Sequence, residues 1–280
     1  MINGMINIII PPVWSGVYIN IAKLLKYSLE DMGKEASIIE AGEIQNGDLS
    51  ILLGWNLVPD EIVLKQPYNI YQLEPLGLPL WQDKLIHKIK LFQRAEKIWD
   101  YSESNTRYLN ELGLKTEVVP LGYHKKLEEV TFSEFPDYDV LFVGFLTDRR
   151  KKIIDELQKH CCVSIQQRWG KDFSEALGRS KILLNIHQYD VPTPLEQPRI
   201  AYALNNGCFV LSEESIDKPY KNLVTCSYDS LINETLNYLH HPKLRNVNQI
   251  KMLDFFRSYQ MKEIVFNALK NINDLNFSGC

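Results

Sequence analysis

Apolar residues in this chain fall into short β-branched runs that alternate with segments of helical period. The short runs predict strands at 6–10, 36–39, 48–53, 69–73 and 97–101. The periodic segments between them predict helices at 17–32, 82–94 and 102–112. Strands that alternate with helices indicate a parallel sheet with helices on both faces, so the first part of the chain is predicted to be an α/β domain.

The same alternation starts a second time after a polar stretch without a clear period. Residues 139–143 begin it as a buried strand, and further strands are predicted at 163–165, 181–185 and 208–211. Helices are predicted at 149–160, 171–178 and 195–206, and the last fifty or so residues have helical spacing throughout. We therefore expect an N-terminal domain at 1–125, a linker at 126–138 and a second α/β domain at 139–280 with C-terminal helices.

Composition narrows the class of protein without pointing to a partner. The 280 residues are 45% hydrophobic and 24% charged, with a net charge of −4, so there is no global electrostatic attraction to nucleic acid or anionic lipid. No apolar run approaches the ~20 residues of a membrane-spanning helix. The five cysteines form no CxxC pair or Cys/His ligand cluster. We expect a soluble, cytoplasmic protein with reduced, structural thiols.

A basic segment opens the first helix of the second domain. Gly144 follows a buried strand, and Arg149 and Arg150 come shortly after it, in the sequence Gly-Phe-Leu-Thr-Asp-Arg-Arg-Lys-Lys. Backbone amides at a helix N-terminus and guanidinium groups both favour anions, so this segment suits a diphosphate. A solvated basic helix face is the alternative interpretation.

Polar residues also follow the strand at 181–185. His187 and Gln188 stand where this strand ends, and Glu196 and Arg199 lie three residues apart at the next helix start. A carboxylate accepts hydrogen bonds from two vicinal hydroxyls, which makes Glu196 a candidate for holding a sugar. The alternatives are a Glu196–Arg199 salt bridge and a histidine held by its neighbours.

The first domain offers weaker candidates for a second substrate. Trp14, Ser15 and Gly16 follow the first strand, where a tryptophan stacks on a ring and a glycine lets backbone approach a ligand. Glu74 ends another strand and is the best candidate for a general base, with Asp100 and Glu103 as competitors and a purely structural carboxylate as the alternative for each. Ser102 is positioned to cap the following helix and is grouped with the same substrate site.

The predicted helix at 82–94 is basic and amphipathic. Lys84, Lys88, Lys90 and Arg94 lie away from its apolar residues. This pattern allows peripheral contact with a membrane or polyanion, with an ordinary solvated surface as the alternative.

The motifs together resemble those of the GT-B glycosyltransferases, especially group 1-like bacterial and viral members. The resemblance extends over nearly the whole chain and is strongest at 139–213, where the Gly-to-Arg-Arg segment, Asn-Ile-His and Leu-Glu-Gln-Pro-Arg-Ile-Ala-Tyr-Ala-Leu-Asn-Asn-Gly follow in the family's order. It implies two Rossmann-like α/β domains facing a cleft, with the acceptor on the first domain and the nucleotide-sugar donor on the second.

Residue roles implied by the resemblance concern mainly the donor. Arg149, with Arg150, would neutralise the diphosphate leaving group, Glu196 would hold ribose or sugar hydroxyls, and Arg199 would assist it. Ser212 and Glu213 would line the nucleotide pocket. Many retaining members carry two glutamates with seven residues between them, and their places are Pro194 and Tyr202 here, so the stereochemical outcome is not predicted.

The function implied by the resemblance is transfer of a hexose from a UDP- or GDP-sugar to a hydroxyl acceptor. That acceptor is a glycan, a lipid-linked glycan, a protein or a modified nucleic acid. We identify no surface-type Asp-x-Asp motif and expect no metal or other cofactor, the nucleotide-sugar being a co-substrate. Two alternatives are a nucleotide-sugar epimerase of the same fold, separable by product analysis with donor alone, and a binding module that neither transfers nor hydrolyses the sugar.

Overall fold

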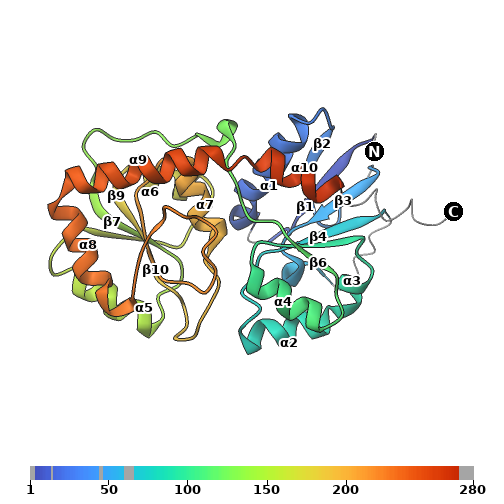
Figure 1. Ribbon diagram of the computed structural model, residues 1–280, viewed down its shortest axis with the longest axis horizontal. Coiled ribbons are helices and arrows are strands. Elements are labelled where there is room, and N and C mark those ends of the chain that lie inside the picture. The colour runs from blue at the N-terminus through green and yellow to red at the C-terminus, as the bar shows by residue number, and fades with distance from the viewer. Residues whose placement is uncertain (1–3, 14, 44–46, 60–65, 271–280) are drawn as a thin grey trace. The chain divides into compact units, whose positions relative to one another are not determined.

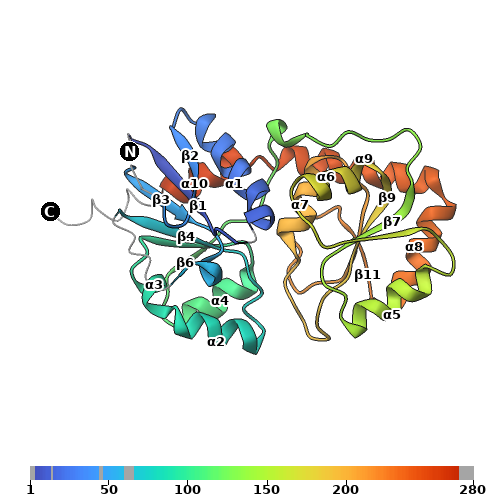
Figure 2. The same cartoon turned by 180° about the vertical axis from the view of Figure 1, so that it is seen from behind.

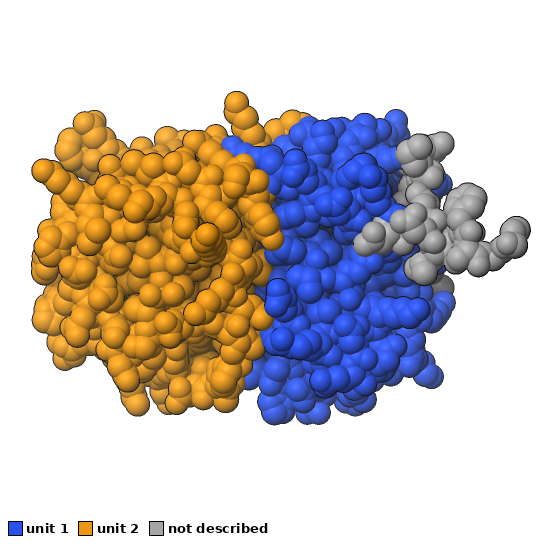
Figure 3. All heavy atoms as spheres, viewed as in Figure 1, with its two compact units in different colours: residues 1–124, 260–280 blue, residues 125–259 orange. Residues whose placement is uncertain are grey.

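The protein folds into two compact units, each with its own parallel sheet. In this computed structural model, residues 4–13, 15–43, 47–59 and 66–270 are described. Unit 1 comprises residues 1–124 and 260–280, and unit 2 comprises residues 125–259 (Figure 3). No helix within the described residues is long and apolar enough to cross a membrane.

Unit 1 is built on a six-stranded parallel sheet in the order β2-β1-β3-β4-β5-β6. Its strands are β1 (Ile6–Ile10), β2 (Ala36–Glu40), β3 (Leu49–Leu52), β4 (Tyr68–Gln72), β5 (Lys97–Asp100) and β6 (Thr116–Val118). Its helices are α1 (Ser15–Glu30), η1 (Trp55–Leu57), α2 (Pro79–His87), α3 (Ile89–Gln93), α4 (Glu103–Glu111) and α10 (Met261–Lys270). The interior strand β1 is buried throughout, as expected for a parallel strand covered on both faces.

Helices cover both faces of this sheet. On one face Ile9, Leu52 and Ile70 pack in a core with Leu85 of α2 and Phe92 of α3. On the other face α1 and α10 lie side by side, although more than 200 residues separate them in the sequence (Figures 1 and 2).

Unit 2 is built on a five-stranded parallel sheet in the order β11-β10-β9-β7-β8. Its strands are β7 (Tyr138–Val143), β8 (Val163–Gln166), β9 (Ser180–Asn185), β10 (Val210–Glu213) and β11 (Val224–Cys226). Its helices are η2 (Lys125–Leu127), α5 (Asp148–Leu157), α6 (Lys171–Gly178), α7 (Gln197–Asn205), η3 (Tyr228–Ser230), α8 (Leu231–His240) and α9 (Pro242–Ser258). Because β7, β9 and β10 are neighbours, the loops after them meet at one edge of the sheet.

The prediction of one continuous helix at 82–94 is wrong, and the difference changes the basic surface expected there. The structure divides it into α2 and α3 at Lys88, whose Nζ donates a 2.8 Å hydrogen bond to the carbonyl oxygen of Val58. The Nζ of Lys84 lies 4.4 Å from the ring centroid of Trp81. Two of the four basic groups are therefore engaged within unit 1, and the continuous basic helix expected from the sequence is not formed.

The boundaries of the units also differ from the predicted domains. Residues 126–138, expected to be a linker, are held on unit 2, where the Oδ1 of Asn206 accepts hydrogen bonds from the backbone amides of Glu129 and Val130. The final helix α10, expected in the second domain, belongs to unit 1. There the Nζ of Lys97 donates a 2.8 Å hydrogen bond to the carbonyl oxygen of Ala268. Helical periodicity identifies an apolar face but not the element that covers it, which explains this error.

Candidate functional site

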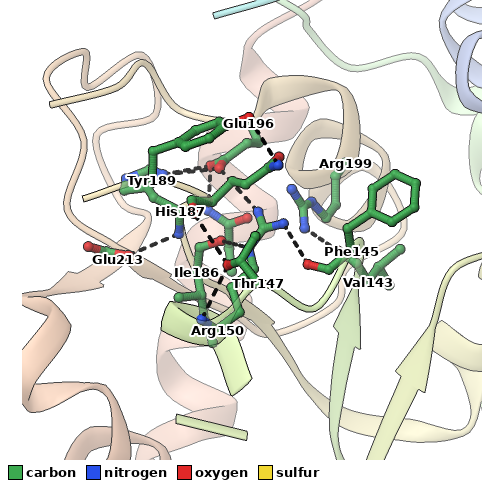
Figure 4. Close-up of polar contacts among 12 residues, drawn as sticks. Val143, Phe145, Thr147, Arg150, Ile186, His187, Tyr189, Glu196, Arg199 and Glu213 are labelled. Carbon is green, nitrogen blue, oxygen red and sulfur yellow. Dashed lines mark hydrogen bonds and ion pairs between the residues drawn. The ribbon is translucent and has the colours of Figure 1, made fainter. Parts of the chain in front are cut away.

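Side chains from three loops meet at the carboxyl ends of β7, β9 and β10 (Figure 4). The first loop ends β7 at Gly144, whose φ of 135° is a conformation that residues with a side chain rarely adopt. It leads to Thr147, the N-cap of α5, whose Oγ1 accepts a 3.5 Å hydrogen bond from the backbone amide of Arg150. The sequence prediction of a strand, a glycine and a basic helix start is confirmed here.

Arg149 is paired with a carboxylate of the same unit. Both of its terminal nitrogens donate to Glu213, the bond from Nη1 to Oε2 being 2.8 Å long. Its guanidinium carbon lies 3.8 Å from the ring centroid of Tyr228, and the Tyr228 hydroxyl donates to the carbonyl oxygen of Arg149. Burial by itself would lower the pKa of Arg149, but the hydrogen bond and charge of Glu213 outweigh it and raise the pKa. Arg149 is thus a fixed cation with most of its charge already compensated.

Arg150 and Arg199 converge beside Gly144 (Figure 4). Arg150 is 3% exposed and donates to the carbonyl oxygens of Ile186 and Phe145, at 2.9 and 3.0 Å. Arg199 is 6% exposed and donates to the carbonyl oxygen of Val143, while its Nε has no hydrogen-bond partner. A methyl group placed on Gly144 would lie 3.4 Å from an Nη1 of each arginine.

These two guanidinium groups are poorly compensated by negative charge. The closest approach of Arg150 to a carboxylate is 3.9 Å, from Nη2 to Oε1 of Glu196. Burial and the neighbouring charge of Arg199 lower the pKa of Arg150 to about 9. Burial also lowers the pKa of Arg199. Two buried, like-charged groups next to each other make a strong anion-binding position.

Glu196 lies at the N-cap position of α7, directly before the first turn that contains Pro198. Its carboxylate is bound by Nδ1 of His187 at 3.0 Å and by Nδ2 of Asn185 at 2.8 Å, and 25% of its side chain remains exposed. Burial would raise the pKa of Glu196, but the hydrogen bond and charge of His187, with help from Arg199 and Asn185, lower it to about 2. A charged, partly exposed carboxylate of this kind accepts hydrogen bonds from hydroxyl groups.

Two predicted donor-binding residues have internal contacts instead. Ser212 is fully buried, and its hydroxyl donates to the carbonyl oxygen of Glu213 and accepts from Nδ2 of Asn185. The expectation that Ser212 lines a pocket is therefore wrong, because a side chain in the middle of β10 points into the sheet packing. The Nε2 of Gln188 donates to the hydroxyl of Tyr189, and the backbone carbonyl oxygen of Gln188 accepts a hydrogen bond from the Thr147 hydroxyl.

In unit 1 the structure places Glu74 just after β4, in contact with α1. The Tyr18 hydroxyl donates a 2.9 Å hydrogen bond to Oε1 of Glu74. Burial raises the pKa of Glu74 to about 7, although the Tyr18 hydrogen bond and the charge of Lys84 act in the opposite direction. A carboxylate that titrates near neutral pH has the proton affinity of a general base.

The other first-domain candidates divide into structural and peripheral positions. Ser102 is fully buried as the N-cap of α4, with its Oγ accepting from the amide of Asn105, so it is not available to a substrate. Asp100 is fully buried too and accepts hydrogen bonds from the Ser102 amide and from Gln72. Ser15 and Gly16 are the half-buried first residues of α1. Trp14 lies outside the described residues.

One motif was missed in the sequence. Asp137-Tyr138-Asp139 has the Asp-x-Asp spacing, but it lies at the amino end of β7, away from the loops described above. Asp137 is paired with Arg179, and Asp139 accepts a 2.6 Å hydrogen bond from Nζ of Lys181. Over the described parts of the chain, no three His, Cys, Asp or Glu side chains gather as a metal site would require.

Comparison with other sequences finds relatives in one giant virus. No protein-family model matches the chain. The uncharacterized protein L140 of Acanthamoeba polyphaga mimivirus is 26% identical over 230 residues, which are 76% of this chain and 72% of that protein. A second mimivirus protein, L137, is 30% identical over 230 residues, and the match spans 75% of this chain but 30% of L137.

Solved structures are similar over almost the full length of the chain. The α-glucosyltransferase AGT in complex with UDP matches with a TM-score of 0.65 and 10% identity over 96% of this chain and 99% of AGT. T4 phage BGT with its UDP-glucose substrate matches with a TM-score of 0.57 and 12% identity over 96% of this chain and 99% of BGT. A glycosyltransferase from Rickettsia africae ESF-5 matches with a TM-score of 0.58 and 12% identity over 99% of this chain and 100% of that protein. The chain has the GT-B fold.

Within the GT-B fold of this chain, sequence reasoning missed three side chains that bind the candidate residues. Tyr18 sits among the buried residues of α1, Asn185 ends β9, and Tyr228 begins η3. Tyr18 is the one aromatic residue on the buried face of α1, which is otherwise aliphatic apart from Ser28, and this is a usable signal. Tyr228 lies in a stretch without period, and nothing in the sequence relates it to Arg149.

Proposed function

We propose that this protein is a glycosyltransferase that moves a sugar from a nucleoside diphosphate sugar to a hydroxyl acceptor. The fold supports this proposal, because its structural neighbours include AGT bound to UDP and BGT bound to UDP-glucose. The observation that carries it is the pair of buried, poorly compensated guanidinium groups of Arg150 and Arg199 beside Gly144.

Charge balance supports a diphosphate as the ligand. Four cationic groups, Arg149, Arg150, Arg199 and His187, meet two carboxylates, Glu196 and Glu213, and the additional Asp190 is almost fully exposed. Glu213 compensates Arg149 and Glu196 compensates His187. The remaining excess lies on Arg150 and Arg199, and it matches the roughly double negative charge of a sugar-linked diphosphate.

This balance changes the roles that the resemblance implied. Arg149 was expected to neutralise the leaving group, but Glu213 occupies both of its terminal nitrogens. We assign that role to Arg150 and Arg199 and regard Arg149 as a positioning residue for the loop around His187. As the bond from sugar to phosphate breaks, negative charge grows on the diphosphate, and the two fixed cations stabilise that charge more than they stabilise the ground state.

Glu196 is the proposed hydrogen-bond acceptor for the sugar or ribose hydroxyls of the donor. Glu196 is charged, lies next to the two arginines and keeps a quarter of its side chain exposed. Its carboxylate would accept hydrogen bonds from a pair of hydroxyls and orient the donor. We infer that the donor is a UDP- or GDP-sugar, with UDP as the first probe because of the UDP-bound neighbours.

Glu74 is the proposed general base that activates the hydroxyl group of the acceptor. With its pKa near 7, it would accept the proton of the attacking hydroxyl. The acceptor is proposed to be a glycan, lipid-linked glycan, protein or modified nucleic acid. Metal independence remains a prediction.

Titration calorimetry with uridine, UMP and UDP, in EDTA and in Mg²⁺, tests the donor site. We expect UDP to bind more tightly than UMP or uridine in both buffers. Arg150→Met and Arg199→Met should each weaken UDP binding by about tenfold or more, since each removes a charge-assisted contact.

Arg179→Met is the matched control, because Arg179 is exposed and paired with Asp137 at the opposite end of the strands. Equal affinity for uridine and UDP, with GDP and ADP also failing to bind better than their nucleosides, would contradict the proposal. Normal UDP binding by both buried-arginine variants would contradict the assignment of the diphosphate to them.

A further inference from the structure

Each ring nitrogen of His187 lies within hydrogen-bond distance of an oxygen atom that accepts hydrogen bonds. Its Nδ1 lies 3.0 Å from Oε2 and 3.1 Å from Oε1 of Glu196, and its Nε2 lies 2.9 Å from the carbonyl oxygen of Glu214. The residue is only 3% exposed, so water cannot readily replace either partner. A carboxylate and a carbonyl oxygen only accept hydrogen bonds, so both ring nitrogens must donate.

A neutral imidazole cannot satisfy this arrangement. With one proton, the ring turns a lone pair toward either the Glu196 carboxylate or the Glu214 carbonyl, and that contact becomes repulsive. The imidazolium satisfies both contacts. The geometry therefore selects the charged ring.

The charged groups around the ring act in different directions. Glu196, before α7, and Glu213, at the end of β10, favour the imidazolium, and the Glu213 Oε2 also accepts from the His187 backbone amide at 2.9 Å. On the α5 side, Arg149 donates to the His187 carbonyl oxygen and Arg150 to that of Ile186, and both oppose it. Burial lowers the pKa of His187, but the Glu196 hydrogen bond and the two carboxylate charges outweigh it, so the pKa is raised.

We propose that His187 is a positioning residue that, as an imidazolium, holds the Glu196 carboxylate charged and oriented toward the donor's hydroxyls. This inference rests on the proposed function and adds a specific role to it. The imidazolium fixes one side of the carboxylate and Asn185 another, and the exposed part of Glu196 is left to accept hydroxyl groups. Loss of the ring proton would remove the main contact that orients Glu196.

The inference predicts a pH dependence of donor binding with a definite direction. Because the folded protein raises the pKa of His187, the contribution of the imidazolium is complete at low pH. It disappears as pH rises through the raised pKa. Below the pKa of about 9 of Arg150, affinity for a hydroxyl-bearing nucleotide should therefore fall as pH rises, and this fall should be absent when residue 187 cannot titrate.

A direct test is ¹⁵N NMR of the histidine rings in the ligand-free, full-length protein. We expect both ring nitrogens of His187 to be protonated at pH 7, with deprotonation above the ordinary imidazole pKa of about 6.5. A ring that is neutral at pH 7 would overturn the inference. This measurement does not depend on any ligand.

A second test measures binding of UDP, 2′-deoxy-UDP and UDP-glucose between pH 6 and pH 8, a range that stays below the pKa of about 9 of Arg150. For His187→Gln we expect affinity for the best of these ligands to be lower by about tenfold at pH 6.5 and nearly constant with pH, because the charge-assisted contact is gone. His160→Gln, a matched change at an exposed histidine in the turn after α5, should behave as the wild type. The deoxy and sugar-linked ligands show whether ribose or sugar hydroxyls are the ones affected.

Glu196→Gln separates positioning from a general loss of stability. If His187 acts through Glu196, the double variant should bind no more weakly than Glu196→Gln alone. Additive losses, or a His187→Gln variant with wild-type affinity and pH profile, would overturn the inference. A wild-type protein that binds no nucleoside diphosphate at any pH would instead overturn the proposed function, while an imidazolium seen by NMR would still stand.

Discussion

Gly144 is the residue on which the proposed anion site depends most directly. Gly144→Ala would place a methyl group 3.4 Å from the Nη1 atoms of Arg150 and Arg199, in the space that a phosphate oxygen would need. We expect UDP affinity to fall by more than about tenfold and the free energy of unfolding to fall by about 1–3 kcal/mol from backbone strain. Calorimetry and thermal unfolding measure the two effects.

Gly170→Ala is the control for that strain. Gly170 also has a positive φ, 65°, but nothing lies within 4 Å of an added methyl group. It should lose comparable stability and keep UDP binding. If both variants bind UDP equally well, Gly144 does not border the anion site.

The raised pKa of Glu74 predicts opposite effects of pH on stability and on activity. Its pKa is raised from 4.5 to about 7, so the folded state holds the proton more tightly than the unfolded state. Stability is therefore lost as pH rises between these values, while the basic form that would serve as the proposed general base appears. Glu74→Gln should raise the free energy of unfolding by about 2 kcal/mol at pH 8 but not at pH 4.5, and should abolish transfer.

Tyr18 provides a finer test of the same carboxylate. Its hydrogen bond lowers the pKa of Glu74, so Tyr18→Phe should move the acidic limb of the transfer rate to higher pH. Tyr68→Phe removes another hydroxyl of unit 1, one that donates to the Leu91 carbonyl oxygen, and should leave the limb unchanged. An identical profile for wild type and Tyr18→Phe would exclude Glu74 as the group that titrates.

The sequence identified the residue types of the candidate site better than their pairing. Arg150, Glu196 and Arg199 were expected in loops that follow strands, where parallel sheets place their binding residues. The bond from Arg149 to Glu213 joins residues 64 apart, and which cation a carboxylate neutralises depends on side-chain positions that no spacing rule contains.

At the level of elements, α10 offers a sharp stability prediction. Val265 is fully buried within unit 1, whereas its neighbour Phe266 is 45% exposed. Val265→Asp should lower the free energy of unfolding of unit 1 by about 3 kcal/mol or more, because an unpaired carboxylate replaces an apolar contact. Phe266→Asp should change it by less than about 1 kcal/mol. Chemical denaturation followed in both variants checks the difference, and equal losses would contradict the packing described.

Most strands were predictable from the sequence, but the two shortest edge strands were not. The buried runs that form β1, β7 and β9 are continuous and β-branched or leucine-rich, so their pattern is distinctive. The strands β6 and β11 have three residues each, lie at sheet edges and are partly exposed, so they carry no periodic signal.

At the scale of the whole molecule, the proposed donor site lies entirely within unit 2. Hydrogen exchange should therefore show UDP-dependent protection at the amides of 144–150 and 186–188. The buried sheet amides of β1 and β4 should exchange at unchanged rates. Protection confined to unit 1 would contradict the location of the donor site.

Unit 1 is assembled from two stretches of chain with the whole of unit 2 between them. During synthesis on the ribosome, α1 and its sheet emerge first, but α10, which packs against α1, emerges after residue 259. Unit 2 is continuous and has all its strands and helices before α10 is made. Within this chain, the stretch of unit 1 that is translated before unit 2 therefore finishes folding only after unit 2 has been made, and the surface of α1 that contacts α10 stays uncovered until then.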